Sequence, residues 1–292
     1  MCIRDSIYKD QIFVSYTREV RENCWNTSLL RGKMNLKLII FKNFFTSHEC
    51  VHFYDNIDSE FNAHQSGGRI VNLNDDTLLF SIGDFRSRFR AQNEDSIFSK
   101  ILEINKQTNN YKVISMGHRN PQGLFFDSKN NILLEAEHGP EGGDEINLIK
   151  LNQQEIPNYG WAISSYGEHY GGKNAPYNKN KYVKYPLHKS HTEHGVNDPL
   201  IYFDPSIGIS QIIGLNEQDK YVVASMKDES LYFFDYDDDN ITRPNKVVNG
   251  RAENIEIKRV HIGERIRDMI YYNEKLYLYL EDTASLAEVS IN

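Results

Sequence analysis

Residues 67–84 read GGRIVNLNDDTLLFSIGD, and this stretch decides the fold class. Two short apolar runs flank a polar turn rich in Asn and Asp, and the second run ends at an acidic residue. Apolar runs of this length, with period-two alternation and bounded by turn residues, are typical of β-strands. The stretch is therefore predicted to form two strands joined by a turn.

The same layout recurs along the chain. Residues 122–139 (QGLFFDSKNNILLEAEHG) and 267–282 (RDMIYYNEKLYLYLED) repeat it, and a looser copy runs from Ile212 through a turn at 216–220 to Ser225. The segments SKILEIN, INLIK, LYFFDY and SLAEVS follow the four copies as outer strands. Repetition of a four-stranded unit at similar intervals predicts the blades of a β-propeller.

Two regions depart from this regularity. Residues 157–200, rich in Tyr, Gly, Asn, His and Pro, are expected to form an extended surface loop of the kind that often carries function. Near the N-terminus, IFVSY at 12–16 and KLIIFKNFF at 37–45 predict strands of a less regular blade. About five blades can be counted.

Composition narrows the functional classes. Hydrophobic residues make up 39% and charged residues 25% of the 292 residues, as in a folded globular protein, and aromatic residues reach 12%, which favours strands. The formal net charge of −8 argues against a nucleic-acid partner. No stretch approaches the roughly 18 consecutive apolar residues that a membrane-spanning helix needs.

The N-terminal region offers few signals of its own. The three cysteines, Cys2, Cys24 and Cys50, form neither an even disulfide framework nor a CxxC motif, so we interpret them as incidental. No signal peptide is visible. Residues 1–6 resemble a non-native start, and we expect the natural N-terminus to be missing.

Several separated motifs carry polar residues at predicted strand ends. HQSGGRI (64–70) and SIGD (81–84) bring a histidine and an aspartate to neighbouring strands, where a carboxylate could orient His64 as a general base. The alternative for His64 alone is a hydrogen-bonded surface histidine. Further motifs are GHRNPQGL (117–124), EHGPEGGDEINLI (137–149), NYGW (158–161), ASMK (224–227) and RIRD (265–268). For RIRD alone, the alternative is an exposed, ion-paired strand end.

In this order, the motifs resemble the soluble PQQ-dependent glucose/sorbosone (aldose sugar) dehydrogenase family over nearly all of residues 60–290. The resemblance implies an all-β propeller of the six-bladed sugar dehydrogenase type that lacks part of its N-terminal blade or blades. Residues 1–50 would form a partial blade and residues 51–292 the dehydrogenase-like propeller. It also implies a quinoprotein that oxidises an aldose at C1 to the lactone by hydride transfer to pyrroloquinoline quinone (PQQ).

The resemblance assigns roles residue by residue. It places the catalytic base at His64, its orienting acid at Asp84, and stabilisation of the reduced cofactor at Arg119. The residues that it assigns to the quinone are Arg119, Asn120, Gln122, His138, Lys227, Arg265 and Arg267. Arginine forks and a lysine suit a cofactor with three carboxylates.

A calcium requirement follows from the same resemblance. Family members hold Ca²⁺ near the quinone through backbone carbonyls corresponding to Gly139 and Pro140, and a second ion is implied at Glu145 and the Tyr159 carbonyl. Hard oxygen ligands suit Ca²⁺. For GDEIN alone, the alternative is an acidic strand start.

The resemblance further implies a small sugar substrate, an external electron acceptor and a periplasmic or secreted location, and it leaves room for a homodimer. Two alternatives stay open: a propeller that lost its cofactor and serves as a binding module, and a calcium-dependent lactonase-type propeller. The spacing His188, His191, His194 suggests a metal cluster at first sight, but the surrounding Gly195 and Pro199 favour solvated loop histidines.

Overall fold

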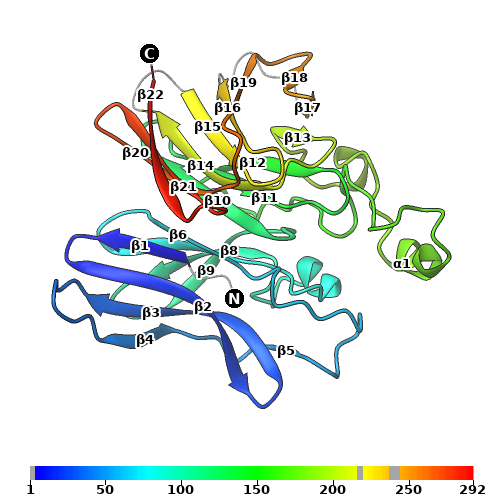
Figure 1. The fold of residues 1–292 in the computed structure, drawn as a ribbon. Helices are drawn as coiled ribbons and strands as arrows, with labels where there is room; N and C mark the ends of the chain where they lie inside the picture. Colours follow the sequence, from blue (N-terminus) through cyan, green and yellow to red (C-terminus); the bar gives the residue numbers. More distant parts are fainter. Residues whose placement is uncertain (1–3, 216–219, 237–243, 292) are drawn as a thin grey trace. The chain divides into compact units, whose positions relative to one another are not determined.

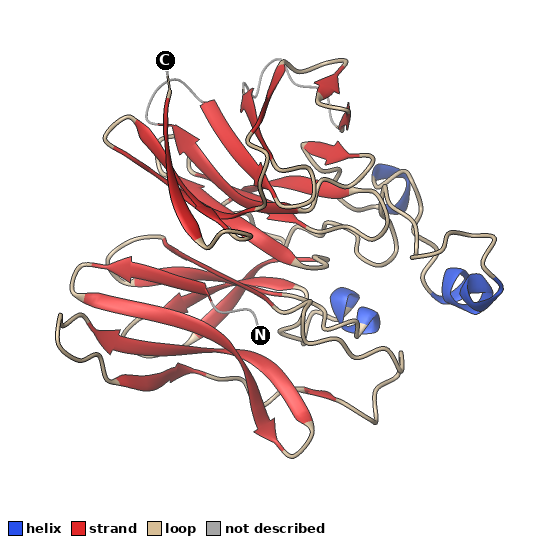
Figure 2. Cartoon of the chain, viewed as in Figure 1, coloured by secondary structure: helices blue, strands red, loops and turns tan. Residues whose placement is uncertain are grey.

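The computed structural model describes residues 4–215, 220–236 and 244–291, and nearly all of the regular structure in these ranges is β-strand (Figure 2). The chain divides into two compact units. Unit 1 comprises residues 1–121 and 152–162, and unit 2 comprises residues 122–151 and 163–292. None of the described helices has the length and apolar character that spanning a bilayer requires.

Unit 1 contains two antiparallel sheets (Figure 1, blue to green strands). The first is formed by β1 (Arg4–Tyr8), β2 (Gln11–Arg21), β3 (Cys24–Lys33), β4 (Phe41–Phe45) and β5 (Val51–His52). The second is formed by β6 (Gly67–Asn72), β7 (Thr77–Ile82), β8 (Lys100–Asn105) and β9 (Tyr111–Met116). A short 3₁₀ helix, η1 (Arg88–Gln92), follows β7. One apolar core joins the sheets, and β7 is buried along nearly its whole length.

Unit 2 contains three sheets. The first is formed by β10 (Pro121–Asp127), β11 (Ile132–Glu137), β12 (Asp144–Lys150), β13 (Ile201–Phe203), β17 (Asn245–Val248) and β18 (Arg251–Ala252). The second is formed by β14 (Ile209–Leu215), β15 (Lys220–Ser225), β16 (Ser230–Asp235) and β19 (Ile257–His261), and the third by β20 (Ile266–Tyr272), β21 (Lys275–Leu280) and β22 (Ser285–Ser290). Strand β14 contacts both β11 and β20, so the three sheets share their apolar faces.

The predicted hairpins are confirmed. The stretch 67–84 forms β6 and β7, and the two further clear copies form β10–β11 and β20–β21. The looser copy forms β14 and β15, while residues 216–219 of its predicted turn lie outside the described residues. Each predicted outer strand is also present, as β8, β12, β16 and β22.

The number of blades agrees with the count from the sequence. The described residues form five blade-like sheets, one fewer than the complete six-bladed type to which the resemblance pointed. The first sheet spans residues 4–52, and Arg4–Ser6 of the suspected non-native start belong to β1. Residues 1–3 of that start lie outside the described residues.

The two irregular regions differ from the expectation. Within 163–200 lie η2 (Pro176–Asn178), α1 (Lys179–Lys184) and η3 (Thr192–His194). His191 is fully buried, with its ring 4.9 Å from that of Tyr166, so solvated loop histidine was the wrong interpretation for this residue. Of the predicted strand 37–45, only β4 pairs with β3, and the residues before it form the β3–β4 loop.

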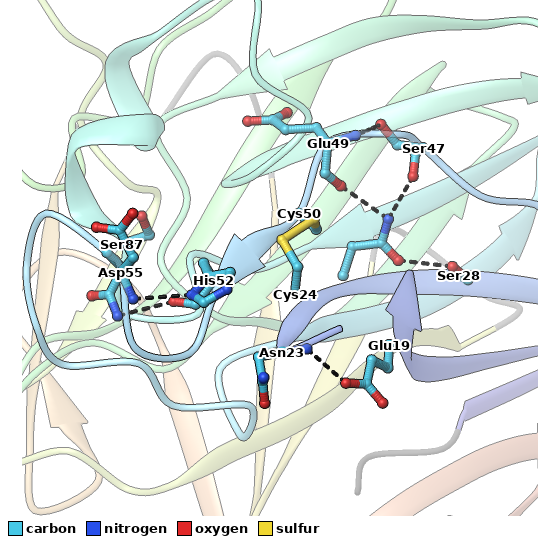
Figure 3. The surroundings of a disulfide bond; sticks show 12 residues. Glu19, Asn23, Cys24, Ser28, Ser47, Glu49, Cys50, His52, Asp55 and Ser87 are labelled. Carbon is cyan, nitrogen blue, oxygen red and sulfur yellow. Dashed lines mark hydrogen bonds between the residues drawn. A yellow bond between two sulfur atoms is a disulfide. The ribbon is translucent and has the colours of Figure 1, made fainter. Parts of the chain in front are cut away.

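The interpretation of the cysteines as incidental was also wrong. Cys24 and Cys50 form a disulfide that links the start of β3 to the segment preceding β5 (Figure 3). Antiparallel pairing of Cys24 with His52 brings the two segments together. The adjoining loop is held by the Asn26 side chain, which donates to the backbone carbonyls of Ser47 (2.9 Å) and Glu49 (3.0 Å). The spacing of the cysteines in the sequence does not reveal this pairing, because the pairing depends on the register of the strands.

Candidate functional site

His64 lies on the short loop that leads into β6. Its imidazole is exposed and makes no hydrogen bond with any residue in the described ranges, while its backbone N–H donates to the Asn62 side chain (2.8 Å). The loop is fastened to the end of β7, since Phe85 N–H donates to the Gln65 carbonyl (3.0 Å) and Asn62 N–H donates to the Phe85 carbonyl (3.1 Å). These hydrogen bonds attach the loop to the end of β7, and the exposed His64 imidazole is accessible to a ligand.

Asp84, two residues after β7, is fully buried. Its Oδ2 accepts a hydrogen bond from the indole Nε1 of Trp161 (2.8 Å), and its Oδ1 accepts one from the backbone N–H of Arg86 (2.7 Å). Burial raises the pKa of Asp84, although the positive charges of Arg119 and Arg88 oppose that rise. The carboxyl is therefore held in place by hydrogen bonds, while burial and the two arginines shift its pKa in opposite directions.

Gln65 connects Asp84 to Arg119. In the amide orientation that satisfies its neighbours, its nitrogen donates to Asp84 Oδ1 (2.8 Å) and its oxygen accepts from Arg119 (2.9 Å) and Arg86 (3.1 Å). Arg119 also lies with its guanidinium 5.3 Å from the Trp161 ring centroid. Its backbone carbonyl accepts from Asp84 N–H (3.0 Å).

These contacts bring three predicted residues into one corner of unit 1. Asp84 and Arg119 share Gln65, and His64 is the residue immediately before Gln65. The expected direct hydrogen bond from Asp84 to the His64 imidazole is not found in the described chain. The Asp84 oxygens already accept hydrogen bonds from Trp161, Gln65 and the Arg86 backbone, and Gln65, the residue after His64, connects Asp84 to this loop.

Two more predicted residues belong to unit 1. The Asn120 side-chain oxygen accepts from Gly67 N–H (3.2 Å), which ties it to the start of β6. Gly67 has a φ of +64°, and a Cβ there would lie 2.8 Å from Gly83 N, so this close approach requires glycine. Tyr159 is buried and stacks on His118, with the ring centroids 5.2 Å apart.

The acidic turn between β11 and β12 lies in unit 2. Gly139 N–H donates to Asp144 Oδ1 (3.1 Å), and the mostly buried His138 has its Nδ1 4.0 Å from the same oxygen. A Cβ on Gly139 would lie 1.8 Å from the Gly143 carbonyl oxygen, so only glycine permits this turn. The Pro140 carbonyl accepts from the Ser206 hydroxyl (3.4 Å). Gln122, on β10, is buried.

Glu145 belongs to a group of buried carboxylates on β11 and β12. Burial, together with the negative charges of Glu137 and Glu135, raises the pKa of Glu145 well above its usual range. Asn147 donates to both Glu135 (2.9 Å) and Glu137 (3.2 Å), while its own side-chain oxygen is buried with no hydrogen-bond partner in the described structure. Closely spaced hard oxygen atoms of this kind suit a divalent cation such as Ca²⁺.

The three remaining predicted cations gather at one end of two neighbouring sheets in unit 2. Lys227 follows β15, and its neighbour Met226 is contacted by Arg265 Nη2 (3.9 Å). Arg265 donates to Glu281 (3.1 Å), and Arg267 donates to the same carboxylate. Burial alone would raise the pKa of Glu281, but the Arg267 hydrogen bond and both positive charges lower it. The ion-paired strand end considered for RIRD is thus present, with both arginines partly exposed.

Sequence reasoning missed four residues that organise these groups, namely Gln65, Arg86, Trp161 and Glu281. Gln65 and Trp161 occur within the motifs HQSGGRI and NYGW, and Glu281 is the acidic residue that ends its hairpin. The signals were therefore present. Nothing in the sequence shows which partner each side chain meets.

The comparisons with known proteins agree with these motifs. The family model described as Glucose / Sorbosone dehydrogenase matches residues 5–287. The chain belongs to the Glucose / Sorbosone dehydrogenase family. The match spans both units and all of the predicted site residues.

Curated relatives of this family member are named as sugar dehydrogenases. The chain is 27% identical over 246 residues to aldose sugar dehydrogenase YliI of Escherichia coli K12, which covers 77% of this chain and 59% of that protein. It is 43% identical over 75 residues to quinoprotein glucose dehydrogenase B of Acinetobacter calcoaceticus, covering 25% of this chain and 15% of that protein. The chain thus spans less than two thirds of the length of these relatives.

Solved structures support the same fold. The soluble aldose sugar dehydrogenase of Escherichia coli in the apo-form aligns over 96% of this chain and 77% of its own, with a TM-score of 0.71 and 22% identity. The PQQ-bound aldose sugar dehydrogenase of Streptomyces coelicolor aligns over 94% of this chain and 70% of its own, with a TM-score of 0.62 and 20% identity. At these identities the likeness concerns the fold of this family member.

Proposed function

We infer that the protein oxidises an aldose sugar at C1 to the lactone, with PQQ and Ca²⁺ as cofactors. The observation that carries this proposal is the corner of unit 1 in which an exposed imidazole, a buried carboxyl and a guanidinium are linked through Gln65. Removing a proton from a hydroxyl requires a general base, groups that hold this base in place, and a fixed positive charge that stabilises the negative charge that develops.

His64 would act as the general base. Its imidazole is accessible, so a sugar hydroxyl can approach and transfer its proton to a ring nitrogen. Asp84, Gln65 and the loop hydrogen bonds would hold the backbone beneath this ring in place. Arg119, kept in position by Gln65 and Trp161, would stabilise negative charge that develops nearby.

The cationic residues fit a tricarboxylated quinone. Lys227, Arg265 and Arg267 form a positive group in unit 2, and both arginines are already aligned by Glu281. The family resemblance also assigns Arg119 and Asn120 of unit 1, and Gln122 and His138 of unit 2, to the quinone. When bound, PQQ with its Ca²⁺ would accept the hydride that leaves the sugar C1.

The oxygen-rich groups fit calcium. The Gly139 and Pro140 carbonyls would serve the ion at the cofactor, and Glu145 would serve a second ion, to which the family resemblance also assigns the Tyr159 carbonyl. The support for the second ion is electrostatic, because a cation would relieve the repulsion between Glu145 and its buried acidic neighbours.

The disulfide supports the proposed location. Disulfides such as Cys24–Cys50 form and persist in oxidising compartments and are rare in the cytosol. We therefore place the protein in the periplasm or outside the cell, where it would pass electrons to an external acceptor.

Reconstitution tests the proposal. The purified chain, supplied with PQQ and Ca²⁺, should bind the quinone and reduce a dye in the presence of an aldose, with the lactone as product, and a calcium chelator should stop the reaction. Failure to bind PQQ would refute the proposal and favour a cofactor-free binding module. Lactone hydrolysis without dye reduction would favour the lactonase-type alternative.

A further inference from the structure

The β3–β4 loop lies at the end of the blue strands of unit 1 (Figure 1). Several of its apolar side chains are exposed to solvent. Leu36 is fully exposed, and Leu38 and Ile40 are each 65% exposed. Ile39 faces the other way, since its Cγ2 would lie 2.7 Å from a Cβ added to Gly32. Three neighbouring aliphatic side chains exposed together are unusual on a water-facing surface and indicate an interaction site.

The loop is also strongly basic. Lys33, Lys37 and Lys42 are exposed, and residues 33–42 contain no acidic residue, although the whole chain carries a net charge of −8. Met34 N–H donates to the Asp10 carbonyl (2.7 Å), so the loop is fixed to the β1–β2 turn. The exposed apolar side chains therefore lie on an anchored loop, among lysines.

A cavity of about 690 Å³ lies beside this loop, entirely within unit 1. Its lining includes five cationic residues, Lys9, Arg31, Lys33, Lys42 and Lys106. The lining carboxylates are Asp10 and Asp75, which pair with Lys33 (3.2 Å) and Lys9 (3.1 Å). The cavity keeps a surplus of positive charge, and Ile40 of the apolar loop forms part of its wall.

Two of the cations are held in position. Arg31 donates through Nη1 to the Lys106 carbonyl (2.8 Å), and its guanidinium lies 5.0 Å from the Phe44 ring centroid. Lys106 Nζ lies 3.8 Å from the Tyr8 ring centroid and donates to the Asn74 carbonyl (2.5 Å). Such pre-arranged cations suit a phosphate group.

We propose that unit 1 docks on an anionic lipid bilayer through the β3–β4 loop. Leu36, Leu38 and Ile40 enter the interface, the lysines contact the headgroup layer, and the cavity receives a lipid phosphate. A free phosphate ion would leave the apolar side chains uncovered. In a two-fold symmetric dimer, a second copy would bring the same positive charges face to face.

Vesicle co-sedimentation at low ionic strength tests the proposal. The chain should sediment with vesicles of phosphatidylcholine mixed with phosphatidylglycerol, bind pure phosphatidylcholine much more weakly, and be released by salt. A Leu36→Trp variant should show a blue shift of its emission with the anionic vesicles, above the background of the two native tryptophans.

Two loop variants and a matched control locate the surface. Leu36→Ser/Leu38→Ser/Ile40→Ser should lose about tenfold in affinity for each side chain that enters the interface. Lys33→Glu/Lys37→Glu/Lys42→Glu should lose at least about a hundredfold in vesicle affinity, because each lysine near the surface contributes about fivefold. The control, Lys179→Glu/Lys181→Glu/Lys184→Glu on α1, makes the same charge change in unit 2 and should leave vesicle binding within a few-fold of wild type.

Four outcomes would overturn the proposal. The first is equal binding to neutral and anionic vesicles, and the second is unchanged binding of both loop variants. The third is loss of binding in the α1 control alone. The fourth is that the protein does not bind vesicles but instead binds inorganic phosphate or dimerises through the loop. Circular dichroism of each variant establishes that the fold is retained. The test needs neither PQQ nor sugar, so its result is independent of the proposed catalytic function.

Discussion

Replacing both disulfide cysteines should destabilise unit 1 by an amount that follows from the chain connectivity. Cys24 and Cys50 are separated by 26 residues, and closing a loop of that length removes about 3.5 kcal/mol of unfolded-state entropy at 25 °C. The Cys24→Ser/Cys50→Ser variant should therefore lose about 3.5 kcal/mol of unfolding free energy. This is a large share of the stability of a typical domain.

Urea titration followed by tryptophan fluorescence measures this loss selectively. Both tryptophans of the chain, Trp25 and Trp161, lie in unit 1, and Trp25 directly follows Cys24. Thiol titration of the unfolded, unreduced wild type should find one thiol, from Cys2, and the Cys2→Ser control should keep the wild-type stability. Three titratable thiols in the wild type, or equal unfolding free energies for wild type and double variant, would refute the reasoning.

Three further changes probe the site groups. Trp161→Phe removes the donor to the buried Asp84 carboxyl and should cost about 2 kcal/mol of unfolding free energy by circular dichroism, whereas no loss would mean that this hydrogen bond is unimportant. Burial raises the pKa of Asp84, so ionising this carboxyl costs more in the folded than in the unfolded state. The wild type should therefore lose unfolding free energy relative to Asp84→Asn as the pH rises from about 4, the ordinary carboxyl pKa, to the folded-state pKa. Urea titrations over a pH series measure this, and a constant difference between the two proteins would argue against it. Glu145→Gln removes a hard oxygen ligand, so the rise in thermal midpoint that Ca²⁺ gives the wild type should be reduced or lost, and an undiminished rise would exclude Glu145 as a ligand.

The strand pattern could be predicted because burial leaves a direct imprint on the sequence. β7 reads as a nearly continuous apolar run because nearly all of its side chains are buried. β11 begins as such a run, but its buried second half contains Glu135 and Glu137. Each blade is a local meander, so neighbours in sequence are neighbours in the sheet. The parallel pairing of β13 with β17 departs from this rule, and the hydrophobic pattern of the sequence did not predict it.

The site was predictable in its residues and less so in its contacts. The motifs identified His64, Asp84 and Arg119, and the structure brings their segments together within unit 1. The link through Gln65 could not be foreseen, because it depends on side-chain directions in a tight loop. Likewise, the pairing of Cys24 with Cys50 depends on the register of β3 with β5, which an odd count of cysteines conceals.

The central claim is that the exposed His64 imidazole is the catalytic base beside a cofactor-binding set that does not depend on it. The most direct measurement compares His64→Ala with the wild type for dye-linked aldose oxidation and for PQQ binding in the same reconstituted samples, with the exposed His48→Ala as matched control. Turnover should fall by about 10²- to 10⁴-fold in His64→Ala alone, while all three proteins bind PQQ equally. Undiminished turnover in His64→Ala would contradict the claim.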